Sequence, residues 1–113
     1  MGSEQRKDPR APSYAKALLL SPPVPGYIRD LSRSGCQVAF MQSVGVTQGD
    51  CITVRVIAEH DPTIPPFLIR LHVRWIKQDS IWLAMGGEID PIEDTQAAGA
   101  FEKLVSYYTG NKA

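Results

Sequence analysis

A strict alternation of apolar and polar residues over residues 69–75 limits what this chain can fold into. One phase of the run is apolar: Ile69, Leu71, Val73 and Trp75. The other phase is basic: Arg70, His72 and Arg74. Because successive side chains of a strand point to opposite faces, this pattern predicts a half-buried strand and does not suit a helix.

Five further segments also suggest strands, and breaks rich in Pro, Gly and polar residues separate several of them. The predicted strands cover residues 14–20, 27–32, 36–41, 52–56 and 81–85, besides the strand that begins at Ile69. The breaks lie at 21–26, 45–50 and 60–66. Short strands with turns at regular spacing indicate an antiparallel sandwich or barrel.

The C-terminal segment changes to helical periodicity. Asp90 is the expected N-cap, with Pro91 at the first helical position and Glu93 at the third. One apolar stripe follows at helical spacing: Ala97, Phe101, Leu104, Val105 and Tyr108. A stripe of this kind could close the mouth of a barrel, and Gly110 is the expected end of the helix.

Length and charge restrict the possible functions. The 113 residues allow one domain and leave no room for a second catalytic module. The 12 basic and 12 acidic residues argue against a long nucleic acid as the main partner. Residues 1–33 nevertheless hold six basic and three acidic residues, which would suit a small dianion or could be chance clustering of solvated charges.

The residues capable of covalent or metal chemistry form no recognisable motif. Cys36 and Cys51 fit neither a disulfide framework nor a metal knuckle, and Cys36 shares its phase with apolar neighbours. His60 and His72 have no metal-binding spacing, and a thiol pair of Cys51 with His72 has no other support in the sequence. We therefore expect no enzyme, no metal and no cofactor.

Compartment can also be predicted from the sequence. No run reaches the ~18 apolar residues of a membrane span, and the first ten residues are mostly polar, unlike a secretory leader. We therefore expect a cytoplasmic protein without membrane insertion.

Two polar stretches form the candidate binding site. Asp30 and Ser32 lie two apart and share one face of a strand, while Gly35 follows where the backbone turns or a ligand approaches closely. Arg6 and Arg10 lie on either side of Pro9, on an arm that is expected to be extended or turning. An arginine fork pairs with phosphate or with guanine O6 and N7, and a carboxylate accepts from the N1–H and N2–H₂ edge of guanine, so the residues favour a guanine nucleotide.

The order and spacing of Arg6-x-x-x-Arg10 and Asp30-x-Ser32-x-x-Gly35 resemble the two-part signature of the PilZ domain, the bacterial receptor module for cyclic di-GMP. The resemblance covers residues 5–109. It implies a mainly β fold, a six-stranded antiparallel β-barrel of split-barrel type with a C-terminal α-helix. Residues 1–12 would form a flexible arm and residues 13–110 the barrel and helix, with the ligand held between the arm and the Asp30–Gly35 stretch.

Trp75 has two possible roles. Its phase with the preceding apolar residues places it in the core, whereas some members of the resembled family stack a tryptophan at this point on guanine, and we favour the partly exposed stacking role. Arg29, Arg33 and Arg74 could add phosphate contacts or could be solvated surface residues.

The resemblance implies a cyclic di-GMP receptor that changes conformation on binding and regulates a downstream protein partner. The processes controlled would be motility, surface attachment, polysaccharide production or virulence. Two alternatives remain at this point: a PilZ-like interaction module that binds no ligand and serves pilus assembly, and a small barrel for single-stranded nucleic acid, which would want several exposed aromatics along a basic groove.

Overall fold

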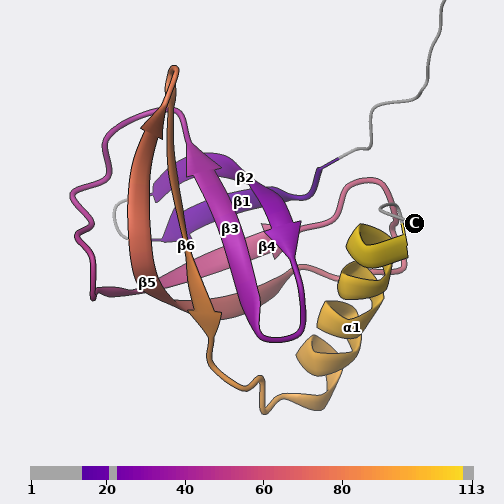
Figure 1. Cartoon of the computed structure of the whole chain (residues 1–113). Coiled ribbons are helices and arrows are strands. Elements are labelled where there is room, and N and C mark those ends of the chain that lie inside the picture. The colour runs from indigo at the N-terminus through magenta and orange to yellow at the C-terminus, as the bar shows by residue number, and fades with distance from the viewer. Residues whose placement is uncertain (1–13, 21–22, 111–113) are drawn as a thin grey trace, which may run out of the picture.

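In the part of the chain that the structure describes, six strands precede one helix (Figure 1). The computed structural model describes residues 14–20 and 23–110, so the predicted arm with Arg6 and Arg10 lies outside the described residues. The elements are β1 (Lys16–Leu20), β2 (Pro23–Leu31), β3 (Gly35–Phe40), β4 (Cys51–Ile57), β5 (Phe67–Asp79), β6 (Trp82–Ile89) and α1 (Thr95–Gly110). The predicted mainly β fold with a C-terminal helix is confirmed.

The strands form a closed antiparallel barrel in the order β1-β2-β3-β6-β5-β4. Closure comes from the pairing of β1 with β4, which gives every strand two neighbours. A closed sheet leaves no exposed strand edge for pairing with another chain. The prediction of a six-stranded antiparallel β-barrel is therefore confirmed.

The alternation of apolar and polar residues along the strands explains which side chains fill the barrel. On β4, Ile52, Val54 and Val56 are buried, whereas Cys51 and Arg55 are exposed. On β5 the predicted apolar phase is buried from Phe67 to Val73. The largest fully buried side chains come from several strands and from α1: Phe40, Ile28, Leu31, Ile69, Leu71, Met85 and Leu104. The interior is thus a packed apolar core, as expected for a barrel of few strands.

Two irregularities interrupt the ladders and change the phase of the side chains. The β2–β3 register passes from Ile28↔Val38 to Asp30↔Gln37, so that Arg29 is the extra residue. On β5 the register with β6 passes over Arg74 in the same way. An extra residue bends the strand and redirects the side chains that follow it.

The predicted break at residues 21–26 is wrong from Pro23 onward, because β2 already begins there. Pro23 and Pro25 pair with Leu20 and Leu18 of β1, whereas the pairing of β2 with β3 begins only at Gly26. Proline has no N–H to donate. It therefore fits a strand only where the side that its nitrogen faces has no neighbouring strand to accept a hydrogen bond. The start of β2, with a single neighbouring strand, meets this condition.

The expected helix start at Asp90 is also wrong. α1 begins at Thr95, and Asp94 Oδ2 accepts a hydrogen bond of 2.8 Å from Ala97 N, which makes Asp94 the N-cap. Asp90 Oδ1 instead lies at hydrogen-bond distance from His72 Nε2, 2.5 Å away. Both Asp90 and Asp94 are suitable N-caps by local sequence. Because Asp90 contacts His72, the helix begins after Asp94 instead.

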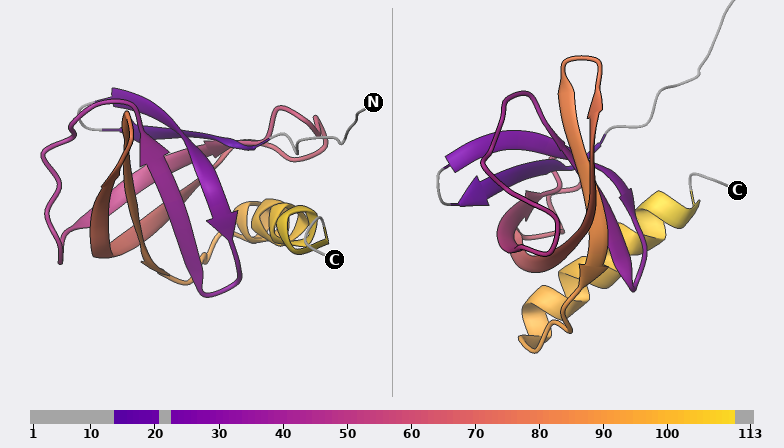
Figure 2. Two further views of the ribbon diagram at one scale, coloured as in Figure 1. Left: turned by 45° about the horizontal axis from the view of Figure 1, so that its top comes forward. Right: turned by 60° about the vertical axis from the view of Figure 1, so that its left-hand side comes forward.

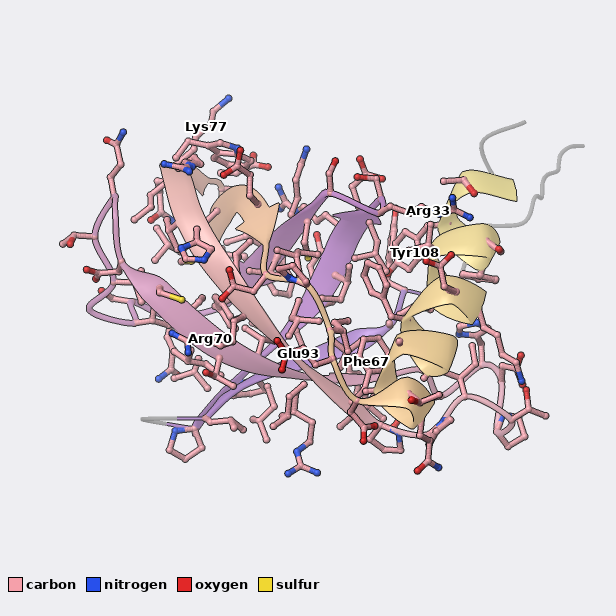
Figure 3. The ribbon with its side chains drawn as sticks, turned by 90° about the horizontal axis from the view of Figure 1, so that it is seen from below. Arg33, Phe67, Arg70, Lys77, Glu93 and Tyr108 are labelled. Carbon is pink, nitrogen blue, oxygen red and sulfur yellow. The ribbon has the colours of Figure 1, made fainter. Side chains whose placement is uncertain are left out.

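The helix packs its apolar stripe beside β2 and β5 (Figure 2). Its buried residues are Ala100, Phe101, Leu104, Val105 and Tyr108. Phe101 contacts Phe67 of β5 with ring centroids 6.2 Å apart, and Figure 3 shows Phe67 and Tyr108 on the side of the barrel that α1 covers. In the described part of the chain, no helix has the length and apolar character needed to cross a membrane.

Tyr108 joins the helix to β2 and to Ala15, the residue that precedes β1. Its hydroxyl accepts from Ala15 N at 3.0 Å and donates to Ile28 O at 2.5 Å, while Ile28 N donates to Ala15 O at 2.9 Å. Burial raises the pKa of Tyr108, which keeps the hydroxyl protonated and able to donate. One buried hydroxyl therefore provides a hydrogen-bond partner for two backbone groups, the Ala15 N–H and the Ile28 carbonyl.

We expect Tyr108→Phe to lower the free energy of unfolding by about 1–3 kcal/mol, because it leaves the Ala15 N–H and the Ile28 carbonyl without this partner. Chemical denaturation followed by circular dichroism measures the change. Tyr14→Phe is the matched control, since Tyr14 is 50% exposed, and it should change stability far less. Equal stability of the two variants would contradict the role assigned to the Tyr108 hydroxyl.

Candidate functional site

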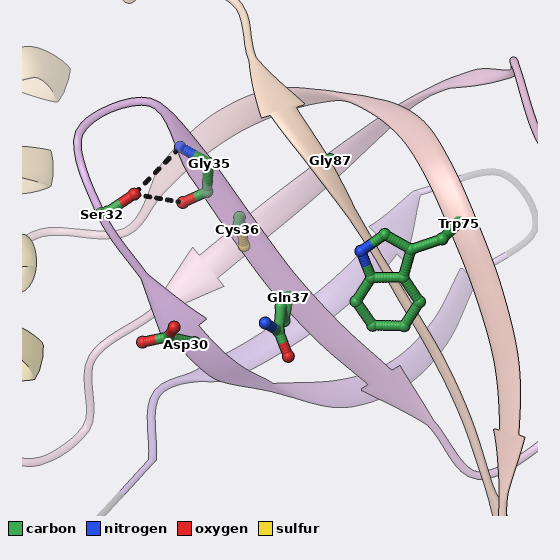
Figure 4. Close-up of a pocket in the computed structure, with 7 residues that line it drawn as sticks. All are labelled: Asp30, Ser32, Gly35, Cys36, Gln37, Trp75 and Gly87. Atoms are coloured by element: carbon green, nitrogen blue, oxygen red, sulfur yellow. Dashed lines mark hydrogen bonds between the residues drawn. The ribbon is translucent and has the colours of Figure 1, made fainter.

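A cavity of 240 Å³ opens on the outer surface of the barrel where β2, β3, β6 and β5 lie side by side (Figure 4). Its walls are formed by Asp30, Ser32, Gly35, Cys36, Gln37, Trp75 and Gly87. Four of the six predicted site residues, Asp30, Ser32, Gly35 and Trp75, thus meet in one cavity. The other two, Arg6 and Arg10, lie outside the described residues.

The turn between β2 and β3 is held by Ser32 and Gly35. Ser32 N donates to Gly35 O at 2.9 Å, and Ser32 Oγ accepts from Gly35 N at 3.2 Å. The hydroxyl also lies 3.4 Å from Gly35 O, to which it can donate. Ser32 therefore has the turn-stabilising role that its residue type suggests, and the same bonds fix its hydroxyl at the edge of the cavity.

Gly35 is required by a close approach of two strands. A Cβ on Gly35 would lie 2.9 Å from Gly87 O of β6. Among the described residues, the glycines with positive φ are Gly45 and Gly49, so backbone conformation is not the reason for glycine at position 35. The absent side chain leaves the main chain of β3 accessible beside β6.

Asp30 is aimed outward by the irregularity at Arg29. It is partly buried, pairs with Gln37 across the ladder, and its Oδ1 accepts from Leu31 N at 3.0 Å. Leu31 is 1% exposed and anchors this end of β2 in the core. The structure agrees with the prediction that Asp30 faces outward and that Leu31 faces the core.

Trp75 lies on the outer surface, although its phase on β5 predicts the core. The extra residue Arg74 shifts the phase, and Trp75 is 38% exposed. A Cβ on Gly86 would lie 2.6 Å from Trp75 Cζ2, so the indole ring rests directly on the backbone of β6. Partial exposure of Trp75 is confirmed, and its stacking on a base stays a prediction.

The three arginines considered as extra phosphate ligands form ion pairs with carboxylates. Arg29 Nη1 lies 2.7 Å from Asp79 Oδ2, and Arg33 Nε lies 3.1 Å from Glu102 Oε1. Arg74 Nη2 lies 2.5 Å from Glu88 Oε1, and this hydrogen bond lowers the pKa of Glu88. These contacts favour the surface role for the three arginines.

Cys36 lies under the floor of the cavity and is 4% exposed. Burial raises the pKa of its thiol to about 12, so the reactive thiolate is not formed at neutral pH. Its predicted role as a small buried apolar residue is confirmed.

Three lining residues were not among the predicted site residues: Cys36, which was expected only as a core residue, Gln37 and Gly87. Gln37 follows Gly35 by two positions and so shares its outward face on β3, which is a signal that the sequence contains. Gly87 has no side chain whose face could be predicted from the sequence. Its place in the cavity follows from its pairing with Cys36 of β3.

We expect Gly86→Ala to displace the indole of Trp75, since the new methyl group would occupy the space of the ring. In a Trp82→Phe background Trp75 is the sole tryptophan, and its emission maximum and acrylamide quenching report the displacement. Gly99→Ala is the matched control, because a Cβ there meets nothing within 4 Å. Identical emission and quenching in the two alanine variants would contradict the described packing of Trp75 on β6.

Comparison with known proteins identifies the family. A family model described as the PilZ domain matches residues 4–109, which is nearly the whole chain. A search of curated proteins finds no significant match. The match includes the segments that carry Arg6, Arg10 and the Asp30–Gly35 turn, and it agrees with the barrel and helix described above. The chain belongs to the PilZ domain family.

Proposed function

We propose that this PilZ domain binds cyclic di-GMP in the cavity between the β2–β3 turn and Trp75. PilZ domains are generally cyclic di-GMP-binding modules and not enzymes. The observation that carries the proposal is the convergence of Asp30, Ser32, Gly35 and Trp75 from three strands and one turn on a single cavity. Asp30 and Trp75 are 45 positions apart in the sequence, so only the fold brings these residues together.

The chemistry of the cavity suits one guanine base. The Asp30 carboxylate can accept from the N1–H and N2–H₂ groups of guanine, and the Ser32 hydroxyl can donate or accept beside it. The exposed face of Trp75 offers a stacking surface, and such stacking is worth ~1–3 kcal/mol per base. Gly35 allows the ligand to approach the main chain closely.

The size of the cavity supports a contribution from the N-terminal segment. Sites for small ligands commonly measure about 300–1,000 Å³, whereas the described cavity measures 240 Å³. A ligand with two guanines and two phosphates would extend beyond these walls. The part outside the cavity is the part that we assign to Arg6 and Arg10.

Charge leads to the same assignment. Asp30 makes the described wall acidic, and Arg29, Arg33 and Arg74 are each engaged with a carboxylate. The two phosphates of the ligand need cationic partners, and arginine pairs with phosphate bidentately. Arg6 and Arg10 are the residues of the family signature that can supply this charge.

Ligand binding would then change the surface of the protein. Contact of Arg6 and Arg10 with a ligand bound in the cavity would create a combined surface of arm, ligand and barrel that a partner could recognise. On this basis the protein acts as a bacterial cytoplasmic receptor whose output is a changed contact with a downstream protein. Motility, attachment, polysaccharide production and virulence are the processes that the family resemblance suggests.

We expect Arg10→Ala to weaken cyclic di-GMP binding about ten- to a hundredfold, because a bidentate arginine contributes ~1–3 kcal/mol. Isothermal titration calorimetry on the full chain measures the affinity. Arg55→Ala is the matched control, since Arg55 is exposed on β4, outside the cavity. Unchanged affinity in Arg10→Ala would remove Arg10 from the site.

The wild-type titration also separates the alternatives. Absence of binding to cyclic di-GMP would favour the interaction module without ligand. Retarded migration of single-stranded oligonucleotides in a gel-shift assay, together with a null titration, would favour the nucleic-acid-binding barrel.

A further inference from the structure

A thiol, an imidazole and a carboxylate converge on the surface of the barrel, outside the lining of the cavity. They belong to Cys51, His72 and Asp90, and their ligand atoms all lie within 4.8 Å of one another. None of the three residues lines the cavity described above. We propose that Cys51, His72 and Asp90 form a binding site for a divalent transition metal, with zinc as the best fit.

The β4–β5 ladder places the first two ligands side by side. Cys51 and His72 are directly paired across the strands, and their neighbours Ile52 and Leu71 are buried. Alternation therefore turns the thiol and the imidazole outward together, and directly paired residues have Cβ atoms about 4.5–5.5 Å apart. Cys51 is exposed and His72 half-buried, so a metal ion from solution can reach both.

The end of β6 brings the third ligand. Ile89 pairs with Leu71, and Asp90 N then donates to Arg70 O at 3.0 Å, which extends the contact with β5 by one residue. This bond holds the Asp90 carboxylate against His72, with Oδ1 2.5 Å from Nε2. The sequence separations of 21 and 18 residues match no metal-binding motif, so the site comes only from strand pairing.

The ligand set selects the metal. Zinc binds thiolate sulfur at about 2.3 Å and imidazole nitrogen or carboxylate oxygen at about 2.0–2.2 Å. Ligand atoms within 4.8 Å of one another can reach such distances by small side-chain rotations. One soft sulfur with one imidazole disfavours magnesium and calcium, which prefer oxygen ligands. Three protein ligands leave a fourth tetrahedral position for water.

Arg70 is the competitor for this site. Its Nη2 lies 3.2 Å from Cys51 Sγ, and its Nε lies 3.8 Å from Asp90 Oδ2. The guanidinium of Arg70 thus occupies a position between the Cys51 sulfur and the Asp90 carboxylate. It must rotate away before a metal binds. Its side chain is 61% exposed on the side of the barrel away from α1, so this rotation meets little obstruction (Figure 3).

The test is binding of Zn²⁺ and Co²⁺ to the reduced full chain. Competition with a chromophoric chelator gives the zinc affinity, and cobalt adds a near-ultraviolet sulfur-to-metal charge-transfer band that reports Cys51 directly. We expect one equivalent of metal, a cobalt band lost in Cys51→Ser, and zinc binding weakened at least about tenfold in His72→Ala and in Asp90→Asn. Arg70→Ala should bind zinc more tightly, because it removes the competing cation.

His60→Ala is the matched control, since His60 is the other histidine of the chain and should leave the affinity unchanged. The three ligands lie on the surface, and circular dichroism verifies that each variant is folded. A missing cobalt band in the wild type, or a zinc affinity that Cys51→Ser and His72→Ala leave unchanged, would overturn the proposal. The readout needs no cyclic di-GMP, so its outcome is independent of the proposed function.

Discussion

The close approach of the backbones of β3, β6 and β5 at Gly35 and Gly87 is the constraint on which the site depends. A Cβ on Gly87 would lie 1.8 Å from His72 O, and one on Gly35 would lie 2.9 Å from Gly87 O. Side chains at these positions would push β3, β6 and β5 apart and open the wall of the barrel. The cavity exists because its floor is backbone, with Trp75 lying on Gly86.

The two extra residues give this surface its polar and aromatic groups. At Arg29 and Arg74 the ladders slip by one residue, and the side chains that follow, Asp30 and Trp75, turn to the outer face. Regular strands would have continued the alternation and carried Trp75 into the core. The same barrel wall therefore combines a packed interior with a carboxylate and an indole that face one cavity.

Helix packing and strand pairing account for the other assignments that local sequence alone left wrong. Asp90 has the residue type of an N-cap, but its contacts with His72 and Arg70 hold it at the end of β6, and Asp94 caps α1 instead. The segment from Pro23 to Pro25 has the composition of a break, yet it pairs with β1 where no second neighbouring strand requires an N–H donor. In both cases a long-range partner outweighed the local preference.

The sequence by itself determined the mainly β class, the C-terminal helix, the buried phase of β4 and β5 and the motif residues, because alternation and spacing are local properties of the chain. It also favoured partial exposure of Trp75, although only through the resemblance to PilZ domains. Tertiary structure decided which residues meet: the cavity walls, the surface position of Trp75, and the convergence of Cys51, His72 and Asp90. The physical reason is that register, strand irregularities and barrel closure depend on partners far along the chain, which no local pattern specifies.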